Sequence, residues 1–184
     1  MRKRFYIAYG SNLNINQMAG RCPTAEIIGT GVIQGYELQF KGPPFACATI
    51  APKEGALVPV AVWDIQPADE MSLDRYEGYP THYFKQDVKV TLSNGEQITG
   101  MAYIMDLGMG YGVPGERYFN IIRHGYWDHG LDVRVLEQAA QDSAEKFMEQ
   151  YRAQREAQFD GEEIPGARNQ APNVPEEWRM GPGQ

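Results

Sequence analysis

The chain has 184 residues, of which 42% are hydrophobic and 22% charged, and its formal net charge is -7. This length suits one domain with a core large enough to fold without disulfides or metals. The negative charge disfavours nucleic-acid binding because it repels the phosphate backbone, and the absence of any run of about 18 apolar residues excludes a membrane-spanning helix.

The first part of the chain predicts five short strands and one helix. Apolar or alternating runs separated by Gly and Pro indicate strands over residues 4–8, 26–33, 36–41, 47–51 and 58–65. A short helix is expected over 14–20, because Asn14 can cap its start. Pro59 lies in the most apolar of these runs and fits only near the start or at the edge of a strand, since it has no N–H to donate.

The middle of the chain predicts a helix followed by a hairpin. The segment 67–76 is typical of a helix, with a proline in its first turn and acidic residues at its positive end. Gly78 should end it. Strands are expected over 83–92 and 97–105, because the Asn-Gly pair at 94–95 is a strong hairpin signal.

Two helices and a tail follow. Apolar residues recur at helical spacing over 118–126, and a second helix is expected after Asp132, with one face formed by Leu136, Ala140, Ser143, Phe147 and Tyr151. From residue 159 the chain is rich in Pro, Gly, Glu and Asn without a period. We therefore predict a domain at 1–158 and a tail at 159–184, in which Trp178 is a candidate anchor. Many short strands with few helices indicate an α+β domain with a mixed, mainly antiparallel sheet that is closed or curved.

The cysteines and the N-terminus bear on location. Cys22 and Cys47 form neither a disulfide framework nor a zinc pattern. Cys47 lies in an apolar run and is expected to be a buried thiol. The apolar stretch 5–9 is too short for a signal-peptide core, so a cytoplasmic location is expected.

The first candidate site is the segment Tyr9-Gly10-Ser11-Asn12-Leu13, which follows a predicted strand and precedes a predicted helix. Gly and Asn permit unusual backbone angles, so successive N–H groups can converge on a carboxylate or an oxyanion. The alternative is a plain strand-to-helix turn, which the pattern alone favours.

The second candidate is Glu77, at the C-terminal end of a predicted helix among three tyrosines. The helix dipole disfavours a carboxylate there, and aromatic surroundings would desolvate it. Both effects raise its pKa toward the range of a general acid or base. The alternative is an exposed glutamate beside a turn.

Other motifs are weaker. The sequence Gly-Tyr-Gly-Val-Pro-Gly at 110–115 formally matches a dinucleotide fingerprint, but the predicted elements around it do not form a βαβ unit. His124 and His129 are five residues apart and miss the spacing of a helical metal pair. Ser11 lacks the Gly-x-Ser-x-Gly elbow of a hydrolase.

Together these segments resemble the γ-glutamylcyclotransferase-like family, which includes the AIG2-like proteins. The opening Tyr-Gly-Ser-Asn-Leu matches in full, and Leu73-Asp74-Arg75-Tyr76-Glu77-Gly78 followed by the aromatic pair Tyr83-Phe84 matches a second motif. A looser third pattern is formed by Pro114, Tyr118, Gly125 and His129-Gly130-Leu131. The order and spacing agree over residues 5–150, and the Tyr79-Pro80 step is similar to the AIG2-like branch.

The resemblance implies a sheet closed into a barrel-like shape with flanking helices and a cavity at one end. It implies that residues 9–13 bind the glutamyl carboxylate, that Tyr83 and Tyr118 also contact substrate, and that Glu77 is the acid–base catalyst. The implied substrate is a small γ-glutamyl amine or peptide, cyclised to 5-oxoproline without a metal or organic cofactor. Two alternatives stay open: a non-catalytic protein that binds a small carboxylate, and an enzyme that hydrolyses an unrelated amide.

Overall fold

The structure is a computed structural model, and it describes residues 4–42, 45–106 and 108–159. The described residues form five strands, four helices and one 3-10 turn, η1. Their order is β1 (Arg4–Ala8), η1 (Ser11–Leu13), α1 (Ile15–Arg21), β2 (Glu26–Lys41), β3 (Cys47–Ile65), α2 (Pro67–Glu77), β4 (Tyr83–Leu92), β5 (Gln97–Met105), α3 (Glu116–Asp128) and α4 (Val133–Phe159). The predicted tail and Trp178 lie outside the described residues.

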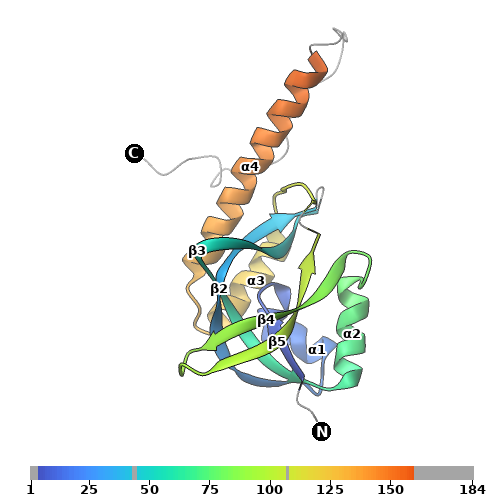
Figure 1. The fold of residues 1–184 in the computed structure, drawn as a ribbon. Coiled ribbons are helices and arrows are strands. Elements are labelled where there is room, and N and C mark those ends of the chain that lie inside the picture. Colours follow the sequence, from blue (N-terminus) through green and yellow to red (C-terminus); the bar gives the residue numbers. More distant parts are fainter. Residues whose placement is uncertain (1–3, 43–44, 107, 160–184) are drawn as a thin grey trace.

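The strands form a closed barrel in the order β1-β3-β2-β4-β5. Neighbouring strands are antiparallel, except that β1 and β5 close the barrel in parallel at Tyr6 and Met101. The predicted α+β class with a mixed, mainly antiparallel barrel-like sheet is therefore confirmed. Figure 1 shows the barrel with α1 and α2 beside it and the later turns of α4 extending beyond it.

Four of the predicted strands are in fact two long ones. Segments 26–33 and 36–41 join as β2, and 47–51 and 58–65 join as β3. Gly35, at a φ of 75°, lies where the β2–β3 register shifts. The pairing passes from Gln34 with Leu57 to Tyr36 with Pro52, so Gly35 lies opposite residues 53–56 of β3. An irregularity of this kind leaves the pairing intact on either side, which is why the glycine does not break the strand.

Pro59 consequently lies inside β3 and not near its start. It pairs with Val32 of β2 on one side, and the pairing of β1 on the other side begins only at Ala61. The proline thus occupies a position where β3 has not yet gained its second neighbour, as its missing N–H requires.

Helix α3 supports the loop that follows β1. A side chain at Gly125 would place its Cβ 2.6 Å from the backbone nitrogen of Asn14 and from Cβ of Leu13. Only glycine permits this close approach of helix and loop. The side chain of Leu13 is fully buried beside α3, and the backbone carbonyl oxygen of Leu13 lies 2.9 Å from Nε2 of His129.

Helix α4 begins after Asp132, as predicted, and packs its first half on β2. The predicted face is buried at Leu136, Ala140 and Ser143, and the hydroxyl of Ser143 accepts a 2.9 Å hydrogen bond from the backbone of Phe40. Further along the same face the side chains are only partly buried, where the helix leaves the barrel in Figure 1. Within the described part of the chain, no helix is both long enough and apolar enough to cross a membrane.

Candidate active site

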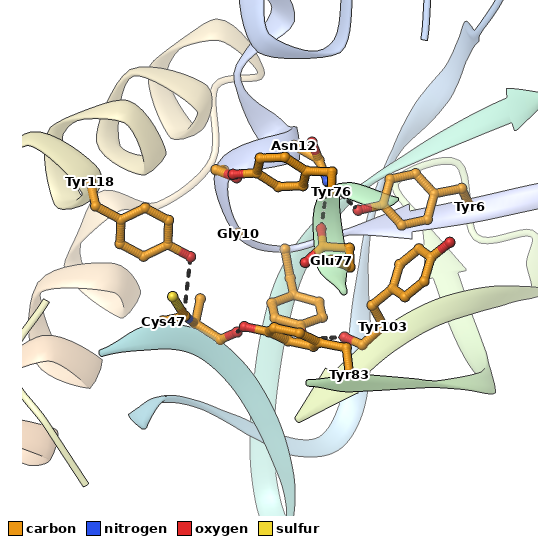
Figure 2. Close-up of a pocket in the computed structure, with 12 residues that line it drawn as sticks. Tyr6, Gly10, Asn12, Cys47, Tyr76, Glu77, Tyr83, Tyr103 and Tyr118 are labelled. Atoms are coloured by element: carbon orange, nitrogen blue, oxygen red, sulfur yellow. Dashed lines mark hydrogen bonds between the residues drawn. The ribbon is translucent and has the colours of Figure 1, made fainter. Parts of the chain in front are cut away.

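A cavity of about 200 Å³ opens at one end of the barrel. Its lining comes from η1, four of the strands and two helices: Tyr6, Tyr9, Gly10, Ser11, Asn12, Cys47, Ala48, Tyr76, Glu77, Tyr83, Tyr103 and Tyr118. Figure 2 shows the carboxyl group of Glu77 among tyrosine rings contributed by different elements. The closure of the barrel therefore assembles a site from segments far apart in the sequence.

Glu77 is the last residue of α2, and the helix ends there for local reasons. Gly78 adopts the left-handed conformation at a φ of 65°, and its N–H donates to the carbonyl of Asp74. A Cβ at this position would lie 2.6 Å from Cδ2 of His82. Glycine is therefore favoured both by the positive φ and by the lack of space for a side chain. The predicted end of the helix is confirmed, and it leaves the Glu77 side chain facing the cavity.

The Glu77 carboxylate is partly buried and accepts a 2.9 Å hydrogen bond from Nδ2 of Asn12. Burial raises its pKa to about 7, against smaller lowering effects of the Arg21 charge and the Asn12 hydrogen bond. A group that titrates near neutral pH can take up and give back a proton during a reaction. The raised pKa expected from aromatic surroundings is present, and the alternative of an exposed glutamate does not describe this side chain.

The segment after β1 forms the turn η1, and four of its five predicted site residues line the cavity: Tyr9, Gly10, Ser11 and Asn12. Leu13 does not, because its side chain is fully buried in the core beneath α3. The N-cap of η1 is Gly10, and no side chain caps the turn. The N–H of Leu13 bonds to the carbonyl of Gly10 within the turn, so the N–H groups of Ser11 and Asn12 are those available at its open start.

The polar side chains of η1 are occupied by protein contacts. Asn12 donates through Nδ2 to Glu77 and, at 2.8 Å, to the hydroxyl of Tyr6. The hydroxyl of Ser11 lies 3.0 Å from that of Tyr76 and accepts from Arg21 at 3.2 Å. These contacts hold the side chains of Ser11 and Asn12 in place at the edge of the cavity.

Tyr83 and Tyr118, the other two predicted residues, both line the cavity and hold the start of β3 between them. The Tyr83 hydroxyl donates to the carbonyl of Ala48 at 2.8 Å, whereas the Tyr118 hydroxyl accepts from the N–H of Ala48 at 3.1 Å. Tyr118 therefore keeps its own proton to donate, and Tyr83 keeps lone pairs that can accept. Figure 2 shows Tyr83 and Tyr118 reaching the strand from different sides.

Several lining residues are absent from the sequence prediction. Tyr6 and Tyr103 come from β1 and β5, and Tyr76 directly precedes Glu77. The Tyr9 hydroxyl donates to the backbone carbonyl of Tyr103, a contact that joins the segment after β1 to β5. Tyr6 lies three residues before the first motif segment and Tyr76 lies within the second motif, but no motif marks Tyr103.

Cys47 corrects one expectation. Its side chain is only partly buried and lines the cavity, because β3 begins at this residue at the open end of the barrel. The fully buried thiol is that of Cys22. Burial raises the pKa of Cys47 above its ordinary value, which keeps the thiol protonated at neutral pH.

Neither a metal centre nor a dinucleotide site is assembled from the parts that the structure describes. No group of three His, Cys, Asp or Glu side chains is placed to hold a metal within residues 4–42, 45–106 and 108–159. The segment 110–115 leads into α3, which is followed by α4, so the two strands of a βαβ unit do not flank this loop.

Comparison with known proteins agrees with this architecture. The family profile described as gamma-glutamyl cyclotransferase, AIG2-like, matches residues 6–129. Human gamma-glutamylcyclotransferase is 30% identical over 141 residues, which cover 72% of this chain and 74% of the human protein. The mouse protein of the same name is 30% identical over 135 residues, covering 68% and 71% of the two chains.

Solved structures show the same fold. A gamma-glutamyl cyclotransferase structure superimposes with a TM-score of 0.69 at 28% identity, covering 75% of this chain and 86% of the other. YkqA from Bacillus subtilis gives a TM-score of 0.64 at 18% identity, covering 78% of this chain and 55% of YkqA. The second likeness concerns the fold alone.

Proposed function

Because the chain belongs to the AIG2-like gamma-glutamyl cyclotransferase family, we propose that it cyclises a γ-glutamyl amine or γ-glutamyl peptide to 5-oxoproline and a free amine. Relatives named gamma-glutamylcyclotransferase support an enzyme of the cyclotransferase type. The observation that carries the proposal is the position of Glu77, a half-buried carboxylate with a pKa of about 7 that faces a cavity and is held by Asn12 of η1.

The substrate of such a reaction carries its own nucleophile. The α-amine of the glutamyl group attacks the γ-carbonyl carbon, a C–N bond closes a five-membered ring, and the amide C–N bond to the leaving amine breaks. The attack is intramolecular, so correct orientation can supply several kcal/mol out of a ceiling of roughly 7–11 kcal/mol. The protein must remove a proton from the α-ammonium, stabilise the oxyanion and protonate the leaving amine.

Glu77 is proposed to perform both proton transfers. As a carboxylate it takes a proton from the α-ammonium, and as a carboxylic acid it gives a proton to the departing nitrogen. A pKa of about 7 makes both forms accessible at neutral pH. One residue can therefore act twice. The ring nitrogen loses its second proton as the lactam forms, the released amine takes up this proton to become an ammonium, and the protein ends the cycle in its starting protonation state.

The backbone of η1 is proposed to bind the negative charges of the substrate. The N–H groups of Ser11 and Asn12 lie at the open start of the turn, where donors stabilise a carboxylate or an oxyanion. The hydroxyl of Tyr118 retains a proton for the same purpose. The cavity of about 200 Å³ is below the roughly 300–1,000 Å³ of pockets for drug-sized ligands, which suits a group the size of one amino acid.

The proposal is tested by incubating the purified protein with γ-glutamyl dipeptides and γ-glutamyl alkylamines and identifying the products. We expect release of 5-oxoproline from at least one compound, without any added cofactor. Release of free glutamate in its place would identify a hydrolase. Binding of the compounds without turnover would show a non-catalytic protein that recognises a small carboxylate.

A further inference from the structure

Arg21 does not line the cavity, but it contacts Ser11 and Asn12, which do. It is the last residue of α1, and its guanidinium donates at 2.6 Å to Oδ1 of Asn12, at 3.2 Å to the hydroxyl of Ser11 and at 2.6 Å to Oε1 of Gln17. Its Cζ atom lies 3.5 Å from the centre of the Tyr76 ring. Four contacts thus fix one side chain between α1, η1 and α2.

These contacts determine which end of the Asn12 amide faces Glu77. The guanidinium has donors only, so the atom of Asn12 beside it must be the oxygen. The nitrogen is then turned toward Glu77, at 2.9 Å, and toward Tyr6, at 2.8 Å. A flipped amide would set its oxygen against the Glu77 carboxylate and its nitrogen against the guanidinium, so both contacts would be repulsive.

We propose that Arg21 is a positioning residue of the active site, which locks the Asn12 amide in the orientation that donates to Glu77 and favours the ionised form of that carboxylate by its charge. This inference rests on the proposed function for its catalytic meaning. The placement of Arg21 against Asn12 is independent of any substrate.

Among the described residues, Arg21 is the charged group that acts on the Glu77 carboxylate. Titratable groups face the carboxylate from every element around the cavity: Tyr6 of β1, Tyr9 directly after β1, Cys47 of β3, Tyr76 of α2, Tyr83 of β4, Tyr103 of β5 and Tyr118 of α3. Burial raises the pKa values of Cys47, Tyr6, Tyr83 and Tyr118, so these groups are neutral at pH 7. The Asp74 carboxylate behind Tyr103 is paired with Lys85 at 2.7 Å.

The Tyr76 ring explains why an arginine is suited to this position. A guanidinium can stack on an aromatic face and donate in its own plane to several acceptors at the same time, which an ammonium cannot do. The ring and three acceptors together set the plane of Arg21. Arg21→Lys should therefore keep the charge but lose the bridge from Asn12 to Ser11 and Gln17.

The test measures the titration of Glu77 directly, by carbon NMR of protein labelled at the glutamate carboxyl groups, with the Glu77 signal identified by its loss in Glu77→Gln. In Arg21→Met we expect the midpoint to rise by about 1 pH unit, the lower end of the effect of a nearby opposite charge. Arg21→Lys should titrate closer to wild type. Arg75→Met, which removes an exposed arginine of α2, is the matched control and should leave the midpoint unchanged.

Turnover gives a second readout. If the midpoint of Glu77 rises from about 7 by about 1 pH unit, the rate of Arg21→Met relative to wild type should fall about fivefold at pH 7 through protonation alone. The deficit should shrink toward pH 9, where both proteins are ionised. An unchanged midpoint and an unchanged rate ratio, with only a lower melting temperature, would overturn the inference and make Arg21 structural. If the wild type releases no 5-oxoproline, the proposed function fails, and the NMR midpoints still decide the role of Arg21.

Discussion

Nδ2 of Asn12 donates a 2.9 Å hydrogen bond to the carboxylate of Glu77, and the two residues are 65 positions apart in the chain. One belongs to the turn after the first strand, and the other ends the helix after the third strand. The barrel is what brings them together. The bond joins the two segments that the sequence identifies as candidate sites.

The glycine at the start of η1 should be more sensitive than the serine after it. A Cβ at Gly10 would lie 3.3 Å from Cβ of Ala48 and 3.7 Å from the hydroxyl of Tyr118. We expect Gly10→Val to lower kcat/KM by about 10²-fold, the scale of a small misplacement of bound substrate. Ser11→Ala should cost less, because it removes only the hydroxyl that faces Tyr76 and Arg21. Equal kinetics for Gly10→Val and wild type would remove η1 from the site.

Stability should depend on pH through Glu77. Its pKa is 4.5 when unperturbed and about 7 in the folded protein, so between these values the folded state binds more protons than the unfolded state. The free energy of unfolding contributed by this group therefore falls as pH rises through that window. Glu77→Gln lacks this penalty, so its melting temperature relative to wild type should be higher at about pH 8 than at about pH 4.5. A difference that is the same at both pH values would contradict the raised pKa.

Turnover should survive exhaustive treatment with EDTA. Structural and catalytic zinc sites need at least three protein ligands from His, Cys, Asp or Glu, and the described residues contain no such group. The comparison is the rate of 5-oxoproline release before chelation, after it and after zinc is returned. Loss of activity with EDTA that zinc restores would show that the cofactor-free mechanism is wrong.

A chain that ends at Gln158 should fold as the whole chain does, because the sequence after residue 159 has no periodic apolar pattern. Thermal melting of the two forms should give similar midpoints. A chain that ends at Asp132 is the contrasting control, since it removes the fully buried side chains of Leu136 and Ala140. A large loss of stability in the chain that ends at Gln158 would show that residues 159–184 contribute to the fold.

What the sequence predicts correctly depends on local signals. The helix that ends at Gly78 and the hairpin at 94–95 were both identifiable because a left-handed glycine and an Asn-Gly turn depend on few neighbours. The breaks predicted within β2 and β3 are wrong for the opposite reason. Whether Gly35 ends a strand or forms a bulge is decided by the partner strand, which lies elsewhere in the chain.

In the candidate site, too, the residues with a local sequence signal can be predicted, and those that depend on distant partners cannot. The motifs predict Glu77 and the turn after β1 as site residues, and the structure brings both to one cavity. Arg21 and Tyr103 cannot be predicted, because no motif or pattern in their own neighbourhoods marks them, and Tyr6 is marked only by lying close to the first motif. They become part of the site only because the fold brings β1, β5 and α1 together around the end of α2. Leu13 is the opposite case, a motif residue whose side chain is buried in the core and does not line the cavity.

The most direct measurement is the rate of 5-oxoproline release by Glu77→Gln beside wild type, with a melting curve and a binding assay for a γ-glutamyl ligand on both proteins. The substitution keeps the size of the side chain and removes its titrating proton. We predict that turnover falls by about 10²–10⁴-fold, the usual contribution of one general acid–base group, while ligand binding persists and the protein melts no lower than wild type near neutral pH. Retained turnover in Glu77→Gln would contradict the assignment of Glu77 as the acid–base catalyst.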